Sequence, residues 1–144
     1  MDDLTHWLHA QLDEDERIAQ AACWDEQSDV WTARPPQASY EQYTVEDYLG
    51  DGVVVVRPEN ADDDGVGQHV ARHDPARVQR EIDAKRRIME CHESWVADNG
   101  DTICGRCGRE HVDGRPGGHF PCQTLRLIAL PYADRPGYRE EWRP

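Results

Sequence analysis

The sequence predicts an α+β fold with an N-terminal helix, a small antiparallel sheet, a long central helix, a zinc-knuckle loop and a C-terminal helix. Three observations predict it. Leucines recur at helical spacing near the N-terminus, β-favouring stretches separated by turn residues follow, and a cysteine cluster comes after a second helical pattern. The 144 residues, of which 38% are hydrophobic, suit one domain with a modest core. We therefore expect a single domain over residues 1–144.

The first helix is predicted at the N-terminus. The aspartates that follow the initial methionine can cap a helix that extends to about Ala22. Its leucines, Leu4, Leu8 and Leu12, approximate one apolar stripe, and acidic residues occupy the opposite side. We expect this helix to pack on the core through the leucines.

The sheet is predicted within residues 24–57, where β-favouring stretches alternate with turn signals. Asp51 and Gly52 come directly before four valines, a pattern typical of a hairpin turn that leads into a buried strand. We expect two or three antiparallel strands. The next stretch, about residues 58–68, is rich in Asp and Gly and has no hydrophobic period, so we expect an acidic loop there.

The central helix has the clearest signals. Asp74 and Pro75 predict its N-cap and its first residue. Its apolar residues keep to one face as far as Val96, and the Asp-Asn-Gly-Asp sequence at 98–101 is expected to end it.

The C-terminal helix is predicted from Pro121 or Cys122 to about Leu130, because Pro131 stops or kinks it. Between the two helices, about residues 98–122 are rich in glycine and cysteine. We expect this segment to be a zinc-binding insert within the domain.

The cysteines of this insert have the spacing of a zinc site. Cys104 and Cys107 form a Cys-x-x-Cys pair, and the neighbouring glycines let the backbone turn around an ion. Cys122 adds a third thiolate, and structural Zn²⁺ takes four N or S ligands in a tetrahedron. We therefore expect these three cysteines to bind a structural Zn²⁺, which would supply folding free energy that a short polar segment cannot obtain from burial.

The fourth ligand is a histidine, for which the sequence offers alternatives. We prefer His92, near the end of the predicted central helix, because binding there would pin that helix to the cysteine loop. His119 is the alternative, since it forms a local His-x-x-Cys with Cys122. His111 suits the role less well because a short hairpin is expected through its segment.

Other interpretations of the cysteines remain open. Free or disulfide-paired thiols are one, and a redox dithiol is another, although the glycines oppose the helix that a redox Cys-x-x-Cys normally opens. The Cys-His-Glu at 91–93 resembles one element of zinc deaminases, but the proline that belongs before Cys104 is absent. Cys23 stands alone and is expected to be a small apolar residue.

A second group of residues could bind a metal. His69 and His73 are spaced i,i+4 and precede Asp74, which together could hold a hydrolytic ion. Capping and packing at a helix junction is the other interpretation, and we favour it because Pro75 disfavours helix at Asp74. No nucleophile elbow, phosphate-binding glycine loop or His-Glu-x-x-His motif occurs, so we assign no catalytic residue and leave the question of an enzyme open, favouring none.

Charge is distributed unevenly along the chain. Residues 1–64 contain 17 acidic and three basic residues, whereas residues 65–144 contain 12 and 13, for a total of -13. Such an acidic half repels phosphate backbones, so we expect no direct nucleic-acid binding. We favour solubility as the role of this charge, and the alternative is that it attracts another protein, a basic one. The sequence has no apolar run of membrane-spanning length and no signal-peptide pattern at its start, so we expect a cytoplasmic protein with no membrane contact. Its oligomeric state cannot be predicted.

Three long phrases resemble an uncharacterised family, a domain of unknown function found in Streptomyces, related actinobacteria and their phages. The phrases are "MDDLTHWLHAQLDEDERIAQAA", "HVARHDPARVQREIDAKRRIM" and "TLRLIALPYADRPGYREEWRP". The resemblance covers about the whole chain and implies no activity. It does imply that the segment between the central helix and the last phrase varies among members. A metal in this segment would stabilise it locally, and His92 would be a credible ligand.

These observations lead to three functional hypotheses. The first is a small acidic cytoplasmic protein with a structural zinc site that acts by interaction or regulation, of phage or prophage origin. The second is a DNA mimic that inhibits a host DNA-processing protein. The third is a metal-dependent hydrolase that uses His69, His73 and Asp74.

Overall fold

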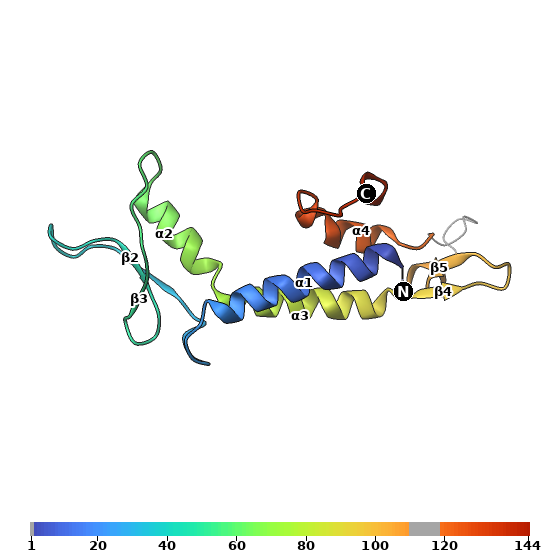
Figure 1. Ribbon diagram of the computed structural model, residues 1–144, viewed down its shortest axis with the longest axis horizontal. Helices are drawn as coiled ribbons and strands as arrows, with labels where there is room; N and C mark the ends of the chain where they lie inside the picture. Colours follow the sequence, from blue (N-terminus) through green and yellow to red (C-terminus); the bar gives the residue numbers. More distant parts are fainter. Residues whose placement is uncertain (1, 110–118) are drawn as a thin grey trace. The chain divides into compact units, whose positions relative to one another are not determined.

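The computed structural model describes residues 2–109 and 119–144, within which four α-helices and two small antiparallel sheets form an α+β fold (Figure 1). The chain divides into two compact units, residues 1–14 with 82–144 and residues 15–81. Two long helices, α1 (Asp3–Ala21) and α3 (Pro75–Cys91), contribute residues to both units. The predicted fold class is confirmed.

The unit of residues 15–81 contains the larger sheet. Strands β1 (Thr32–Arg34), β2 (Thr44–Glu46) and β3 (Gly52–Val55) are antiparallel and lie in the order β1-β2-β3. Helix α2 (Asp63–Arg72) packs against this sheet. The shared core consists of Tyr43, Val45, Val56 and Ala71, with Trp31 and Val66 among the residues packed against it.

Helix α2 corrects one expectation, because it begins at Asp63, inside the segment expected to be an acidic loop over about residues 58–68. Asp62 is its N-cap, and the Asp62 carboxylate accepts a hydrogen bond from the Gly65 N–H at 2.6 Å. The run of aspartates is therefore a helix start, which acidic side chains stabilise through the positive end of the helix dipole.

The unit of residues 1–14 and 82–144 combines α-helices with the smaller sheet. It contains α4 (Gln123–Ala129) and the antiparallel pair β4 (Ser94–Val96) and β5 (Thr102–Cys104), in addition to its parts of α1 and α3. Three short 3₁₀ helices, η1 (Cys107–Arg109), η2 (Leu130–Tyr132) and η3 (Glu140–Trp142), complete the described elements of this unit. Its buried side chains include those of Leu4, Leu8, Leu12, Ile82, Met89, Leu125, Ala129, Tyr132 and Trp142. The predicted leucine stripe of the first helix therefore faces the core.

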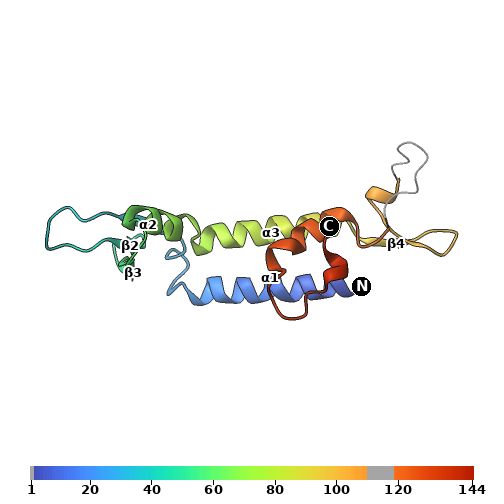
Figure 2. The same cartoon turned by 90° about the horizontal axis from the view of Figure 1, so that it is seen from above.

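The end of the chain packs back on the start of α1 (Figure 2). The Trp7 indole N–H donates to the Pro136 carbonyl at 3.0 Å, and the Arg139 guanidinium lies 2.9 Å from the Asp3 carboxylate. Trp7 also contacts the ring of Trp142, with 5.5 Å between ring centroids. These contacts fix the C-terminal segment to the N-terminal helix.

The central helix is shorter than predicted. It begins at Pro75, as expected, but it ends at Cys91 rather than at Val96. Residues 94–96 pair with residues 102–104, and the 98–101 turn, with Gly100 at φ 87°, closes this hairpin instead of ending a helix. The spacing of Val96 matches the apolar face of a helix by coincidence. The β-branched and aromatic residues before the Asn-Gly turn favour a strand instead. Among the described helices, none is both long and apolar enough to cross a membrane.

Candidate metal centre

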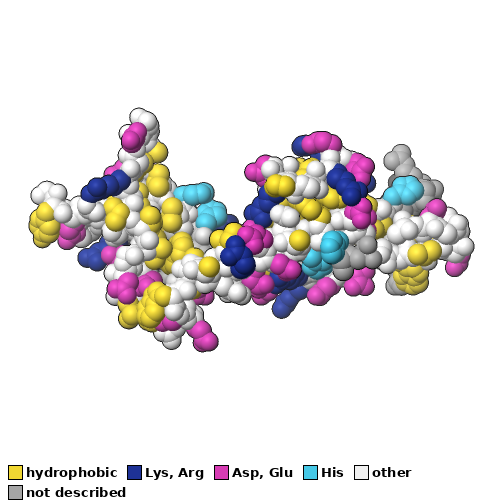
Figure 3. Space-filling view, viewed as in Figure 1, with side chains coloured by type: hydrophobic (Ala, Val, Ile, Leu, Met, Phe, Trp, Pro, Cys, Tyr) yellow, Lys and Arg dark blue, Asp and Glu magenta, His cyan; other side chains and the backbone are white. Residues whose placement is uncertain are grey.

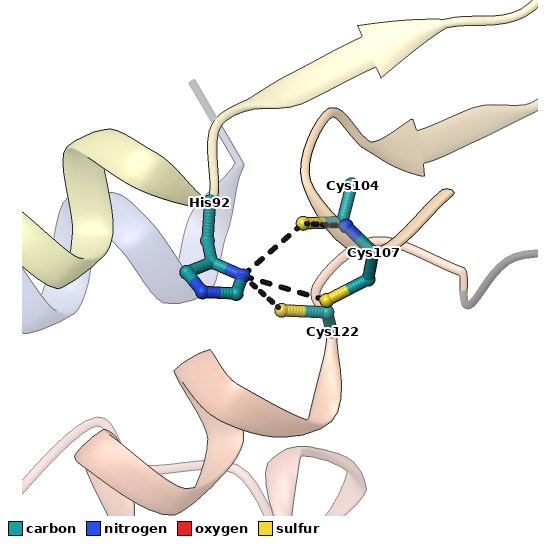
Figure 4. Close-up of side chains that lie close together, drawn as sticks. All are labelled: His92, Cys104, Cys107 and Cys122. Atoms are coloured by element: carbon teal, nitrogen blue, oxygen red, sulfur yellow. Dashed lines mark hydrogen bonds between the residues drawn. The ribbon is translucent and has the colours of Figure 1, made fainter. Parts of the chain in front are cut away.

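Four side chains from separate segments of one unit converge on a single point (Figure 4). His92 directly follows α3, Cys104 ends β5, Cys107 begins η1, and Cys122 is the N-cap residue of α4. Their ligand atoms all lie within 4.8 Å of one another. No other group of this kind, with three or more His, Cys, Asp or Glu side chains, occurs among residues 2–109 and 119–144.

The distances within this cluster do not describe a hydrogen-bond network. The Nδ1 atom of His92 lies 3.4 Å from the Cys104 sulfur, 3.5 Å from the Cys107 sulfur and 3.5 Å from the Cys122 sulfur. One imidazole nitrogen carries either one hydrogen or one lone pair, so it can make one hydrogen bond and not three. The three similar distances from this nitrogen to the sulfurs therefore need another explanation.

The same distances match a tetrahedral metal site. With Zn–S bonds of about 2.3 Å and Zn–N bonds of about 2.0 Å, tetrahedral angles place a nitrogen ligand roughly 3.5 Å from each sulfur ligand. The three measured separations, 3.4, 3.5 and 3.5 Å, agree with that value. The donor set of three sulfurs and one ring nitrogen is also one that structural Zn²⁺ takes. The residues fit such an ion.

The surroundings of the sulfurs also favour a cation. Cys104 and Cys122 are buried, with 0% and 3% of their surface exposed. Burial, together with the neighbouring Cys104 and Cys122, raises the pKa of the Cys107 thiol to about 12. Without a metal the neutral thiol of Cys107 is therefore favoured, and a divalent ion beside this sulfur would favour the thiolate instead. The site is compatible with a metal.

Backbone hydrogen bonds position the ligands. The His92 N–H donates to the Met89 carbonyl, which continues the last turn of α3 and presents the imidazole beyond its end. The Gly105 N–H donates to the Glu93 carbonyl and holds the Cys-x-x-Cys turn against the strand that follows His92. The Cys107 N–H in turn points at the Cys104 sulfur at 3.4 Å. Hydrogen bonds of this kind commonly orient the residues that bind a metal.

The other candidate ligands of the sequence lie elsewhere. His119 is exposed, forms an isolated bridge with Ile103 and does not belong to the cluster. His111 and the hairpin expected around it fall within residues 110–118, outside the described part of the chain. Cys91 and Cys23 are free cysteines that also stay outside the cluster. Of the two proposed fourth ligands, the structure places His92 beside the three sulfurs.

The second candidate site is arranged differently. The rings of His69 and His73 lie against each other with 4.3 Å between centroids, and His73 Nδ1 is 2.8 Å from the His69 carbonyl oxygen. The Asp74 carboxylate accepts hydrogen bonds from the N–H groups of Trp31 and Arg77. Asp74 therefore caps α3 and links this helix to Trp31, the residue before β1. His69, His73 and Asp74 do not form a ligand group.

One feature of the surface escaped sequence reasoning. Trp24 and Tyr48 stack on each other, with ring centroids 6.1 Å apart and planes 14° apart, although 62% and 46% of their surfaces are exposed. The sequence offered one signal for this contact, namely that each aromatic residue has an aspartate as its neighbour: Asp25 follows Trp24, and Asp47 precedes Tyr48. Only the fold shows that the two dipeptides meet.

The sequence matches the profile of one protein family over residues 1–144, and that family is described as a family of unknown function (DUF6221). No curated protein and no solved structure matches the chain.

Proposed function

We propose that this chain, which belongs to the family of unknown function DUF6221, holds a structural Zn²⁺ ion at His92, Cys104, Cys107 and Cys122 and acts by protein interaction rather than by catalysis. The observation that carries the proposal is the placement of one imidazole nitrogen 3.4–3.5 Å from three cysteine sulfurs. Hydrogen bonding does not account for that arrangement, and tetrahedral coordination does.

The number of ligands supports a structural role. Catalytic zinc sites commonly use three protein ligands and leave the fourth position to water or substrate. Here four protein side chains offer a ligand atom each, which is enough to complete a tetrahedron, so a bound ion would have no position for a reacting molecule. When bound, the ion would join the end of α3, the β4-β5 hairpin and the start of α4.

The donor chemistry supports zinc over other metals. Thiolates and imidazole suit zinc, whereas calcium and magnesium prefer oxygen ligands. An iron–sulfur cluster normally takes four cysteines or, on one iron of Rieske centres, a pair of histidines, and this cluster provides three cysteines and one histidine. Elemental analysis decides between these metals directly.

Native mass spectrometry with elemental analysis tests the metal site. We expect one zinc per chain in the purified protein and its loss in a His92→Ala variant, because three sulfurs alone leave the coordination open. His119→Ala is the matched control: it removes an exposed histidine outside the cluster and should keep the zinc. A protein without zinc, or a His92→Ala variant that retains it as tightly as the parent does, would contradict the proposal.

The interaction part of the proposal is supported by the acidic first half of the chain and by the exposed aromatic pair of Trp24 and Tyr48. We infer a basic protein partner in the cytoplasm and no direct nucleic-acid contact. A phage or prophage origin rests on the resemblance of the three sequence phrases. The contacts of Asp74 as a helix cap count against a hydrolytic site at His69 and His73, and a second bound metal would restore it.

The acidic half also motivates a DNA-mimic function, which makes a different prediction. A mimic would bind a basic DNA-processing protein, and both salt and competing DNA would weaken that complex. An arginine-bearing partner that DNA does not displace would instead support a dedicated protein interaction.

A further inference from the structure

Trp24 and Tyr48 form an exposed aromatic pair that is held rigidly. The Trp24 indole N–H donates to the Asp47 carboxylate at 2.7 Å, and the Tyr48 hydroxyl donates to the Asp25 carboxylate at 2.6 Å. Each ring is therefore anchored by the aspartate that neighbours the other ring in sequence. We name these four residues, Trp24, Asp25, Asp47 and Tyr48, the aromatic-acidic surface.

The two carboxylates are themselves fixed to the backbone. Asp47 accepts hydrogen bonds from the Leu49 and Asp51 N–H groups at 3.0 and 3.1 Å. Asp25 accepts from the Gln27 and Ser28 N–H groups at 2.9 and 2.8 Å. The rings are thus ordered before any partner arrives, which lowers the entropy lost on binding.

Trp24 borders two hollows of the surface, both without a basic side chain. One is lined by Gln20, Cys23, Trp24, Asp25, Glu26, Asp29 and Gln79. The other is lined by Ala21, Ala22, Cys23, Trp24, Asp47, Asp51, Gly52 and Val53. Carboxylates therefore line both hollows together with Trp24, which is 62% exposed.

The charge of this region has one sign. Residues 18–56 contain seven acidic residues and a single basic one, Arg34, which pairs with Glu46 at 3.2 Å. The hydrogen bond from Tyr48 lowers the pKa of Asp25, and the bond from Trp24 lowers the pKa of Asp47. Both groups therefore remain carboxylates at neutral pH and keep a negative field beside the rings.

Apolar side chains extend the surface. Leu49, in the turn between β2 and β3, is 59% exposed, and Val53 of the edge strand β3, which is 39% exposed, lines the second hollow with Trp24. In Figure 3, hydrophobic and acidic side chains lie together over the part of the sheet formed by β2 and β3. Exposed apolar side chains that adjoin charged ones are typical of interaction sites.

We propose that the aromatic-acidic surface docks an arginine-bearing segment of a partner protein, with the guanidinium over the exposed Trp24 ring and paired with the carboxylates around it. Arginine fits better than lysine because its planar, weakly hydrated guanidinium stacks on aromatic faces and pairs with carboxylates at its edge. The negative field opposes a nucleic acid and a second copy of this surface. This inference deepens the interaction part of the proposed function and is independent of the metal.

The test is a titration of the full-length, zinc-analysed protein with a hexa-arginine peptide, followed by NMR of the indole N–H signals. We expect the Trp24 signal to shift on binding and hexa-lysine to bind more weakly. Trp24→Ala should lower the affinity for hexa-arginine about tenfold or more, as loss of an aromatic anchor does. Tyr40→Ala is the matched control: Tyr40 is 85% exposed in the same unit, and its removal should leave binding unchanged.

A second pair of variants tests the charges without disturbing the rings. Glu26→Gln with Asp51→Asn neutralises one carboxylate of each hollow and should weaken binding. Glu59→Gln with Asp63→Asn removes the same charge outside both hollows and should weaken it less. Equal effects of the two pairs, equal affinity for hexa-lysine, or full binding by Trp24→Ala would overturn the proposal. Because zinc content is measured on the same sample, failure here is distinct from failure of the metal site.

Discussion

At the scale of single residues, the bond between Tyr48 and Asp25 links protonation to the shape of the surface. The Tyr48 hydroxyl lowers the pKa of Asp25 below its ordinary 3.8, and Asp25 in turn raises the pKa of Tyr48 to about 12. For a carboxyl group with a lowered pKa, the stabilisation is present above the ordinary pKa and is lost as the pH falls through the folded value. The aromatic pair should therefore loosen in acid, and again as the pH rises through about 12, where the Tyr48 hydroxyl loses the proton that it donates.

Tyr48→Phe tests this bond directly. Removing the hydroxyl should raise the pKa of Asp25 toward 3.8, because that hydrogen bond is the main cause of the shift. The measurement is a pH titration of the carboxyl carbon by NMR. Tyr40→Phe, which removes the hydroxyl of an 85% exposed tyrosine, is the control and should leave Asp25 unaffected. If Asp25 titrates identically in both variants, the bond is absent in solution.

The sequence predicted which cysteines lie close together where the signal was local. The Cys-x-x-Cys turn identified Cys104 and Cys107 from their spacing, and the start of the last helix identified Cys122. His92 and His119 could not be separated in this way, because the choice depends on how the β4-β5 hairpin folds back on the end of α3. The contact between Trp24 and Tyr48 was missed because it also depends on the tertiary fold, which brings the segment after α1 against the turn between β2 and β3.

At the scale of elements, α2 lies close to the sheet because it has a glycine where the two meet. A Cβ atom added at Gly67 would overlap the Tyr43 ring, and Tyr43 belongs to the core of this unit. The Tyr43 hydroxyl also donates to the α2 residue Asp64 at 2.7 Å, so the ring has little freedom to move away. The packing of this helix depends on the missing side chain.

Gly67→Ala should therefore lower the free energy of unfolding by about 1–3 kcal/mol, the usual effect of overpacking, despite the better helix propensity of alanine. Gly52→Ala is the control, since a Cβ atom there meets no neighbour within 4 Å and should change stability by less than about 0.5 kcal/mol. Urea unfolding measures both. A Gly67→Ala variant as stable as the parent would mean that α2 sits farther from Tyr43 than described.

Element boundaries were predictable where capping residues marked them. Asp74 and Pro75 gave the start of α3, and Pro131 gave the end of α4 within a residue or two. The end of α3 was not predictable from apolar periodicity, because Val96 satisfies a helical period and a strand equally well. The Asp62 cap was overlooked since glycines after it suggested a loop.

At the scale of the whole molecule, the four candidate metal ligands all belong to one of the two compact units. Removing a structural ion should therefore affect the two units unequally. A Cys122→Ser variant, or the parent treated with a chelator, should lose amide-exchange protection in β4, β5 and the start of α4, because the ion would hold these segments together.

The β2 and β3 amides of the other unit provide the internal control and should keep their protection. Cys23→Ser provides the external one, since Cys23 lies outside the cluster. Hydrogen exchange read by mass spectrometry resolves these segments. Uniform loss of protection through the whole chain, or no loss anywhere, would contradict a metal that stabilises one unit.

The burial of Cys104 and Cys122 also bears on how long a bound ion stays. A filled tetrahedron would give an incoming chelator no place to attach, and the residues Cys104 and Cys122 are only 0% and 3% exposed, so a ligand must leave before exchange begins. Release would then follow local opening of the fold, on the time scale of unfolding rather than of diffusion. Such a protein would be a final recipient of zinc and not a shuttle that passes it on.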